Sequence, residues 1–184
     1  MLTREEAARL VKSNVGEKKI LYHMLAVEAM MRGLARILGE DEDLWGLTGL
    51  LHDIDYEKTR NEPEKHAVVA GELLRGLVPD GVIRAIKAHN FQYTKVKPKT
   101  KMEKALIACD ALSGLIIACA LVMPSKKLEE VKVKTIMKKF KDKDFARGAS
   151  RDRIILCEEI GVERKRFFQI ALDALKGISS ELGL

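Results

Sequence analysis

The sequence is poor in cysteine and in aromatic residues, and each shortage excludes a class of protein. The three cysteines among its 184 residues form no Cys-x-x-Cys pair and lie in apolar segments. Such cysteines predict buried thiols in a reducing compartment rather than a disulfide scaffold. Aromatic residues make up 5% of the chain and do not alternate with basic ones. This disfavours a surface that stacks single-stranded nucleic acid.

Strand-like alternation of useful length, internal repeats and low-complexity linkers are also missing. Hydrophobic residues make up 47% of the chain and recur with helical spacing. A chain of this length can bury a sizeable core. We therefore predict an all-α fold, a compact multi-helix bundle formed by a single domain over residues 1–184. The first fourteen residues carry charges throughout and lack the apolar core of a secretory signal, so we expect a cytoplasmic protein.

Capping residues, glycines and prolines divide the chain into predicted helices. Gly39 is placed to end a long helix, while Pro63 and Pro79 are placed in the first turns of two later ones. Residues 90–100 contain Pro98 and three lysines with little helical period, and we interpret them as a mobile basic loop. The predicted helices cover residues 3–14, 17–38, 41–55, 63–77, 79–89, 102–123, 126–141, 152–160 and 163–182.

The segment 102–123 is apolar enough to suggest a membrane span. However, it contains Asp110 and Ser113 and has charged residues on both flanks, and no second span follows. These features favour the buried central helix of a bundle over a helix in lipid.

Histidine is rare, and all four histidines lie in the first half of the chain: His23, His52, His66 and His89. His23 is placed opposite the charged stripe of its predicted helix, and His66 and His89 align with apolar residues of theirs. His52 is followed directly by Asp53. Asp110 is the only charged residue between positions 105 and 123, where an ionised carboxylate needs a partner. These side chains are therefore expected to point inward.

Four imidazoles and two carboxylates form a nitrogen and oxygen ligand set. Such a set suits iron, manganese, cobalt, nickel or zinc. An ordinary zinc site takes four ligands, so six are too many for one. We therefore expect His23, His52, Asp53, His66, His89 and Asp110 to bind two divalent transition-metal ions.

The order of these residues resembles the HD-domain metal-dependent phosphohydrolases. That family has a histidine, then a His-Asp pair, then a distant aspartate, matched here by His23, His52-Asp53 and Asp110. The additional His66 and His89 resemble its binuclear branch, in which the aspartate of the pair bridges two metals. The resemblance implies a metal-binding core over about residues 17–123. Residues 124–184 are expected to form a basic helical extension, and its lysine-rich part, residues 124–148, is similar to that of a small branch of predicted hydrolases.

The sequence departs from the family pattern at two positions. Many members have Gly-Lys two residues after the His-Asp pair, where this chain has Asp55 and Tyr56. The Gly-Tyr-Pro motif of cyclic-dinucleotide phosphodiesterases is also absent, which argues against that substrate.

The resemblance implies hydrolysis of a phosphoester or phosphoanhydride by a metal-bound hydroxide, with a nucleotide-like small molecule as substrate. Asp53 would act at the metals, and Glu57, one helical turn later, would orient water or take a proton. Three further residues near the ligands are candidates for binding substrate: Lys58, Arg60 and Asn90.

Positive charge is concentrated in residues 95–153, which hold sixteen Lys or Arg and seven Asp or Glu. Lys95 and Lys97 belong to this region, and we assign them to attracting a phosphorylated substrate. The same charge would suit RNA or DNA, which we favour less because of the aromatic shortage. A solvated lysine-rich surface is the plain alternative.

Two other functions fit the same ligand order. Di-iron oxygenases built on this fold resemble the chain equally well in their ligands, and a non-catalytic nucleotide sensor would use the same pocket. The basic region favours the hydrolase over the oxygenase.

Overall fold

The computed structural model describes all 184 residues, and it contains helices and no strands, as predicted. Two short 3₁₀ segments, η1 (Leu128–Glu130) and η2 (Ile155–Ile160), lie in the second half. The α-helices are α1 (Arg4–Asn14), α2 (Lys18–Leu38), α3 (Glu42–Leu51), α4 (Tyr56–Thr59), α5 (Val68–Leu73), α6 (Asp80–His89), α7 (Phe91–Thr94), α8 (Lys101–Leu121), α9 (Val133–Lys141), α10 (Arg151–Ile154), α11 (Arg164–Gly177) and α12 (Ser179–Leu182).

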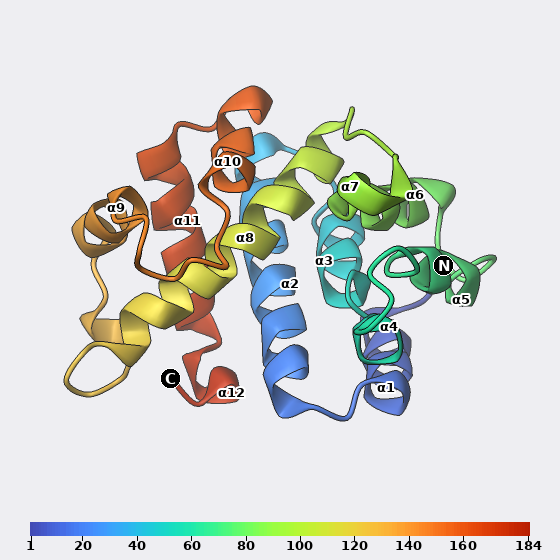
Figure 1. Cartoon of the computed structure of the whole chain (residues 1–184), viewed down its shortest axis with the longest axis horizontal. Helices are drawn as coiled ribbons and strands as arrows, with labels where there is room; N and C mark the ends of the chain where they lie inside the picture. Colours follow the sequence, from blue (N-terminus) through green and yellow to red (C-terminus); the bar gives the residue numbers. More distant parts are fainter.

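The two longest helices, α2 and α8, pack against each other at the centre of the molecule (Figure 1). Gly39 ends α2 in the left-handed conformation, with φ 68°. Thr100 and Glu103 form a capping box at the start of α8. Although α8 is long and apolar enough to cross a membrane, 61% of its most apolar window is buried inside the protein. It is therefore a core helix of the bundle.

Two hydrophobic clusters lie on the two sides of this centre. The larger has 34 buried residues, mainly from α2, α8 and the helices after α8. The smaller has 15 buried residues, from α1, α2, α3, α5 and α6 and the turns between them. In Figure 1 the helices of the smaller cluster lie to the right of α2, and α9 to α12 lie to its left. Both α2 and α3 contribute to each cluster, so they join the two sides.

The helix predicted to carry His66 is shorter than expected. Residues 63–67 form turns, and α5 begins only at Val68. Ala67 has a φ of 69°, so the helix that begins at Val68 does not extend back to His66. The reason is long-range, because the Asp55 carboxylate accepts hydrogen bonds from the backbone N–H groups of Ala67 and Ala70, each at 2.9 Å. This carboxylate caps α5 from another segment and fixes where the helix starts.

The face of α2 that carries Glu28 is not a solvent-exposed stripe, as we assumed from the sequence. Glu28 is 4% exposed and forms ion pairs with Arg4 of α1 and Arg32 of α2. A Cβ added at Gly49 of α3 would lie 2.9 Å from the Glu28 Cα. Glycine at this position therefore allows α3 to pack closely on α2.

Residues 90–100 are more ordered than the predicted loop. Four of them form α7, and the Thr94 hydroxyl donates to the carbonyl oxygen of Lys87 at 2.7 Å. Further on, Arg84 donates to the carbonyl oxygen of Lys97 at 3.2 Å. These bonds hold the segment against α6.

Candidate metal centre

The six predicted ligands come from five segments that meet between α2 and α8. His23 lies in α2, His89 ends α6, and Asp110 lies in the middle of α8. His52 and Asp53 follow the last residue of α3, and His66 occupies the turn before α5. The structure therefore brings all six side chains to one place.

The first group of side chains is formed by His23, His52, Asp53 and Asp110. The Nε2 atoms of His23 and His52 are 3.2 Å apart. Asp53 Oδ2 is 3.6 Å from His23 Nε2, and Asp110 Oδ1 is 3.1 Å from the same atom. Nitrogen and oxygen atoms thus surround one point.

The second group is formed by His66, His89 and Asp53. The Nε2 atoms of the two histidines are 3.0 Å apart. Asp53 Oδ1 is 3.3 Å from His66 Nε2 and 3.5 Å from His89 Nε2. Asp53 is the residue shared by both groups. Its Oδ1 atom also lies 3.5 Å from His52 Nε2, whereas Oδ2 faces His23, so Asp53 contacts all four histidines.

The other ring nitrogens show which tautomer each histidine adopts. His52 Nδ1 is 2.8 Å from the carbonyl oxygen of Gly49, and His89 Nδ1 is 2.5 Å from that of Ile86. A carbonyl oxygen only accepts hydrogen bonds, so both Nδ1 atoms carry the hydrogen. The Nε2 lone pairs of His52 and His89 therefore point into the centre.

In His23 and His66, too, Nδ1 is bonded outside the centre, so Nε2 faces inward. The Ser113 hydroxyl donates its one hydrogen to the carbonyl oxygen of Asp110 at 2.9 Å, so it accepts from His23 Nδ1 at 3.1 Å. His66 Nδ1 donates to Asp55 Oδ1 at 2.9 Å. Metal-binding histidines are usually oriented in this way, by a hydrogen bond from the second ring nitrogen.

Four Nε2 atoms and two carboxylates face one another, so they need positive charge between them, from protons or from a bound cation. The donors are all nitrogen and oxygen, which divalent transition metals accept. Burial lowers the pKa of His23 and His66, but hydrogen bonds to the aspartates outweigh burial and raise it, so in the metal-free protein a hydrogen at Nε2 supplies part of this charge. A cation bound at the centre would take the place of these hydrogens. The donor set is therefore compatible with resident metal ions.

The carboxylates are held ionised. Burial would raise the pKa of Asp53, but the nearby histidines outweigh it and hold that pKa well below its ordinary value of 3.8. Burial would also raise the pKa of Asp110, but the hydrogen bond from His23 outweighs burial and lowers that pKa to about 2. The pKa of His52 is lowered to about 4, mainly by burial. At neutral pH this part of the site offers carboxylates and a neutral imidazole.

Comparison with known proteins agrees with this geometry. Residues 20–115, more than half of the chain, match the HD domain. The protein belongs to the HD-domain family. The matched range contains all six side chains of the candidate centre.

Curated relatives of this HD protein include two bacterial ribonucleases. Ribonuclease Y of Desulfotalea psychrophila is 31% identical over 147 residues, which are 77% of this chain and 27% of that protein. Ribonuclease Y of Oleidesulfovibrio alaskensis is 33% identical over 99 residues, which are 53% of this chain and 18% of that protein. The chain thus spans about a quarter or less of the length of these relatives. No solved structure matches it.

Two residues that we assigned to chemistry have structural roles instead. Glu57 Oε1 accepts from the backbone N–H groups of Gly16 and Glu17 at 2.9 and 2.7 Å, which caps the start of α2. Lys58 donates to Asn14 at 2.7 Å. Both side chains point towards the connection between α1 and α2, so neither fits the predicted role at the centre.

Three more of the predicted substrate-binding residues also lie elsewhere: Asn90, Lys95 and Lys97. Asn90 donates to the carbonyl oxygens of Pro63 and His66 at 2.9 and 3.0 Å, so it holds the turn that carries His66. Lys95 donates to the carbonyl oxygen of Gln92. Neither Lys95 nor Lys97 lines the cavities beside the centre. Asn90 was assigned by its proximity to His89 in sequence, and Lys95 and Lys97 by the concentration of positive charge; neither signal gave the direction of a side chain.

Two adjoining cavities open onto the centre. One has a volume of about 510 Å³, and the predicted Arg60 lines it, although its guanidinium also pairs with Glu17 at 2.5 Å. The other has a volume of about 630 Å³. The residues that line both are Lys19, His23, Tyr56 and Asp110.

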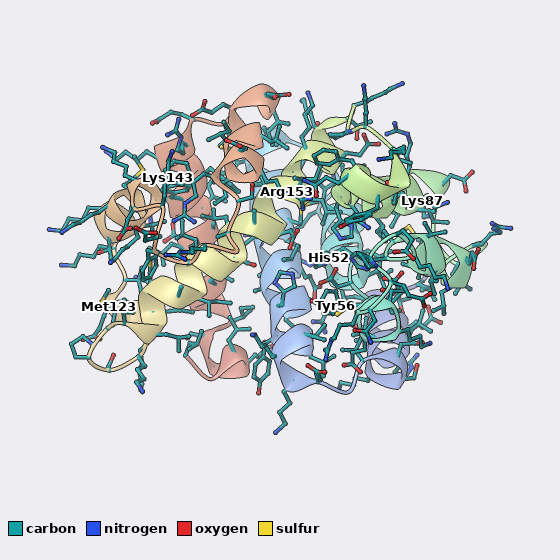
Figure 2. All side chains as sticks on the ribbon, in the orientation of Figure 1. His52, Tyr56, Lys87, Met123, Lys143 and Arg153 are labelled. Carbon is teal, nitrogen blue, oxygen red and sulfur yellow. The ribbon has the colours of Figure 1, made fainter.

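The sequence reasoning missed Lys19, Tyr56, Asp55 and Arg153. Asp55 is fully buried and orients His66, while Tyr56 packs edge-on against the His66 ring at 5.6 Å between centroids. Asp55 could have been suggested by the general rule that the second ring nitrogen of a metal-binding histidine donates a hydrogen bond to a nearby partner. Figure 2 shows His52, Tyr56 and Arg153 near the middle of the molecule, whereas Lys143 and Met123 lie at its far left.

Proposed function

We propose that this HD-domain protein is a metal-dependent phosphohydrolase. The observation that carries the proposal is the sharing of Asp53 by two histidine pairs, beside two adjoining cavities whose walls carry Lys19, Arg60 and Arg153. Membership of the HD-domain family supports the same class of reaction. The residues that would hold the metal ions are His23, His52, Asp53, His66, His89 and Asp110.

Bound divalent cations would supply Lewis acidity, which activates water near neutral pH and offsets phosphate charge. The protein's own contribution is to position the groups. The hydrogen bonds at each Nδ1 fix the four imidazoles, and Asp55 and Asn90 hold the turn of His66. The basic side chains at the cavities would attract a phosphorylated substrate.

We propose a phosphoester or phosphoanhydride of a nucleotide-like small molecule as the substrate class. Cavities of about 510 and 630 Å³ have the volume that small-molecule sites commonly have. The names of the relatives add the phosphodiester bonds of RNA as a second class. A terminal nucleotide of an RNA chain would present the same phosphate chemistry to the cavities.

The di-iron oxygenase has the same ligand order and remains the alternative from another class. An oxygenase does not need positively charged side chains in its cavity, so Arg153 and Lys19 favour the hydrolase. A nucleotide sensor would bind without turnover.

The test is metal analysis of protein purified without chelators, followed by a screen of nucleotides, dinucleotides, phosphomonoesters and short RNA with several divalent ions. The proposal predicts phosphate release or RNA cleavage that chelators abolish. Bound iron with a mixed-valent spectroscopic signal and no phosphate release would contradict it. Tight nucleotide binding without turnover would favour the sensor.

A further inference from the structure

Arg153 lies outside the matched HD domain but reaches the candidate metal centre. It belongs to α10, and it lines the 630 Å³ cavity together with His23 and Asp110. Its side chain is 21% exposed, and its guanidinium lies over the Phe91 ring at 5.4 Å. The C-terminal part of the chain therefore contributes a wall of the cavity.

The Arg153 guanidinium makes no hydrogen bond within the protein. Its nearest acidic atom is Asp110 Oδ2, 3.8 Å from Nη1 and beyond hydrogen-bond distance. The other oxygen of Asp110 faces His23 Nε2 at 3.1 Å. A guanidinium has five N–H donors, and one that is largely removed from water is stabilised by an anionic acceptor. The unused donors of Arg153 face the cavity.

Arg151, two residues earlier, shows what a purely structural arginine does in the same segment. Its guanidinium donates to six backbone carbonyl oxygens, at distances from 2.6 to 3.1 Å. Those carbonyls belong to Lys139, Phe140, Asp142, Phe145, Ala146 and Ala149. Arg151 thereby ties down the chain that leads into the cavity wall, whereas Arg153 has donors to spare.

The rest of the wall suits an anionic ligand of some size. Lys19 and Ser150 also line the cavity, and Lys19 forms no ion pair. Gly114 and Gly148 line it too, and a Cβ added at either position would meet nothing within 4 Å. The glycines leave space beside the cationic groups.

We propose that residues 148–153 build a phosphate-binding subsite on the HD core, with Arg153 as its main ligand and Lys19 and Ser150 beside it. This inference rests on the proposed phosphohydrolase function and names the residue that recognises the substrate. A planar guanidinium donates two parallel hydrogen bonds to phosphate oxygens, which an ammonium group does not do. The subsite places that phosphate on the side of the centre formed by His23 and Asp110.

The test measures binding of inorganic phosphate to Mn²⁺-loaded protein by calorimetry, in the wild type and in Arg153→Gln. The expected result is binding that is on the order of tenfold to a hundredfold weaker in the variant, with unchanged metal content. Arg153→Lys should recover part of the loss. Arg147→Gln is the matched control, because Arg147 is an exposed arginine of the same region that pairs with Asp144. It should bind phosphate like the wild type.

Phosphate affinity that is equal in Arg153→Gln and the wild type would overturn the subsite. So would a loss of metal content that fully accounts for the weaker binding, because Arg153 would then only orient Asp110. Failure of the hydrolase proposal is a separate outcome. If no phosphoester is turned over but phosphate binding still depends on Arg153, the subsite stands and the reaction class falls.

Discussion

The two sides of the molecule are stabilised in different ways. The larger hydrophobic cluster of 34 residues packs long helices, α2, α8 and α11, by apolar contact. The smaller cluster of 15 residues includes short helices joined by turns, and polar bonds such as those of Asp55 hold its segments in place. The candidate metal ligands lie where α2 and α8 meet the short segments. A bound cation would therefore contribute more to the smaller side than to the larger one.

The two sides of the molecule also differ in what their buried polar residues do. On the short-segment side, buried acidic groups hold histidines and turns. On the C-terminal side, Arg151 holds backbone and Arg153 faces the cavity. The following predictions test this division, beginning with the largest expected effect.

Asp53→Asn should lower phosphohydrolase activity on the order of 10³-fold or more, because Asp53 is shared by both histidine pairs. The change keeps the size of the side chain but removes a charge that would balance two cations. Steady-state kinetics on the substrate found in the screen measures the loss. Near-normal turnover by metal-depleted Asp53→Asn protein would contradict a metal-dependent reaction.

Asp55→Ala should destabilise the protein by about 3 kcal/mol, because it removes a buried carboxylate that bonds His66 and two backbone N–H groups. Denaturant unfolding of the metal-free protein measures this. Glu57→Gln is the contrast and should cost less than about 1 kcal/mol, because its amide oxygen still accepts from the backbone N–H groups of Gly16 and Glu17. We also expect Glu57→Gln to keep its metal and most of its turnover. A drop of 10²-fold or more in turnover at full metal content would restore Glu57 as a general acid or base.

Removal of metal should lower thermal stability, by about 2.7 kcal/mol if the free metal is at a hundred times its dissociation constant. The loss should be uneven, because the cation would tie the short segments to α2 and α8. Amide hydrogen exchange should accelerate in α5 and α6 and change little in α11. Equal acceleration in all three helices would show that the two sides do not differ in this respect.

The metal-free protein should become less stable as pH rises from about 6.5 towards 10, and this effect should be smaller than the preceding ones. Burial lowers the pKa of His66, but hydrogen bonds to Asp53 and Asp55 outweigh burial and raise it from 6.5 to about 10. Because the folded value lies above the unfolded one, this contribution is complete below pH 6.5 and is lost as pH approaches 10. Unfolding curves across this range, compared with those of His66→Gln, measure the effect. A wild type whose pH profile matches that of His66→Gln would contradict it.

The sequence predicted the parts of the fold that depend on local signals. Thr3, which caps α1 together with Glu6, and Gly39 and Pro79 mark bounds of α1, α2 and α6. The helical period placed His23 and His89 on inward faces, and its isolation among apolar residues did so for Asp110. The start of α5 could not be predicted, because it depends on Asp55 reaching Ala67 and Ala70 across a turn. The helix predicted over residues 126–141 begins only at Val133, and those predicted over 152–160 and 163–182 are each divided in two.

The candidate site was predicted better in its ligands than in its surroundings. Four of the ligands are histidines, which are rare in this chain, and Asp110 is the only charge in its apolar segment, so the pattern and its resemblance to the HD family single the set out. Glu57, Lys58 and Asn90 were assigned by their nearness to a ligand in sequence, but their side chains bind backbone or side-chain groups elsewhere. Arg153 was missed because only tertiary packing brings α10 to Asp110, 43 residues away in the chain.

The central claim is that the four histidines and two aspartates hold metal. The most direct measurement is the metal-to-protein ratio of wild-type protein purified without chelators, determined by elemental mass spectrometry beside Asp53→Asn. The account predicts roughly two transition-metal ions per chain in the wild type, the number that a binuclear centre holds, and a large loss in the variant. Wild-type protein that stays free of metal after incubation with Fe²⁺, Mn²⁺, Co²⁺, Ni²⁺ and Zn²⁺, or a ratio that Asp53→Asn leaves unchanged, would contradict it.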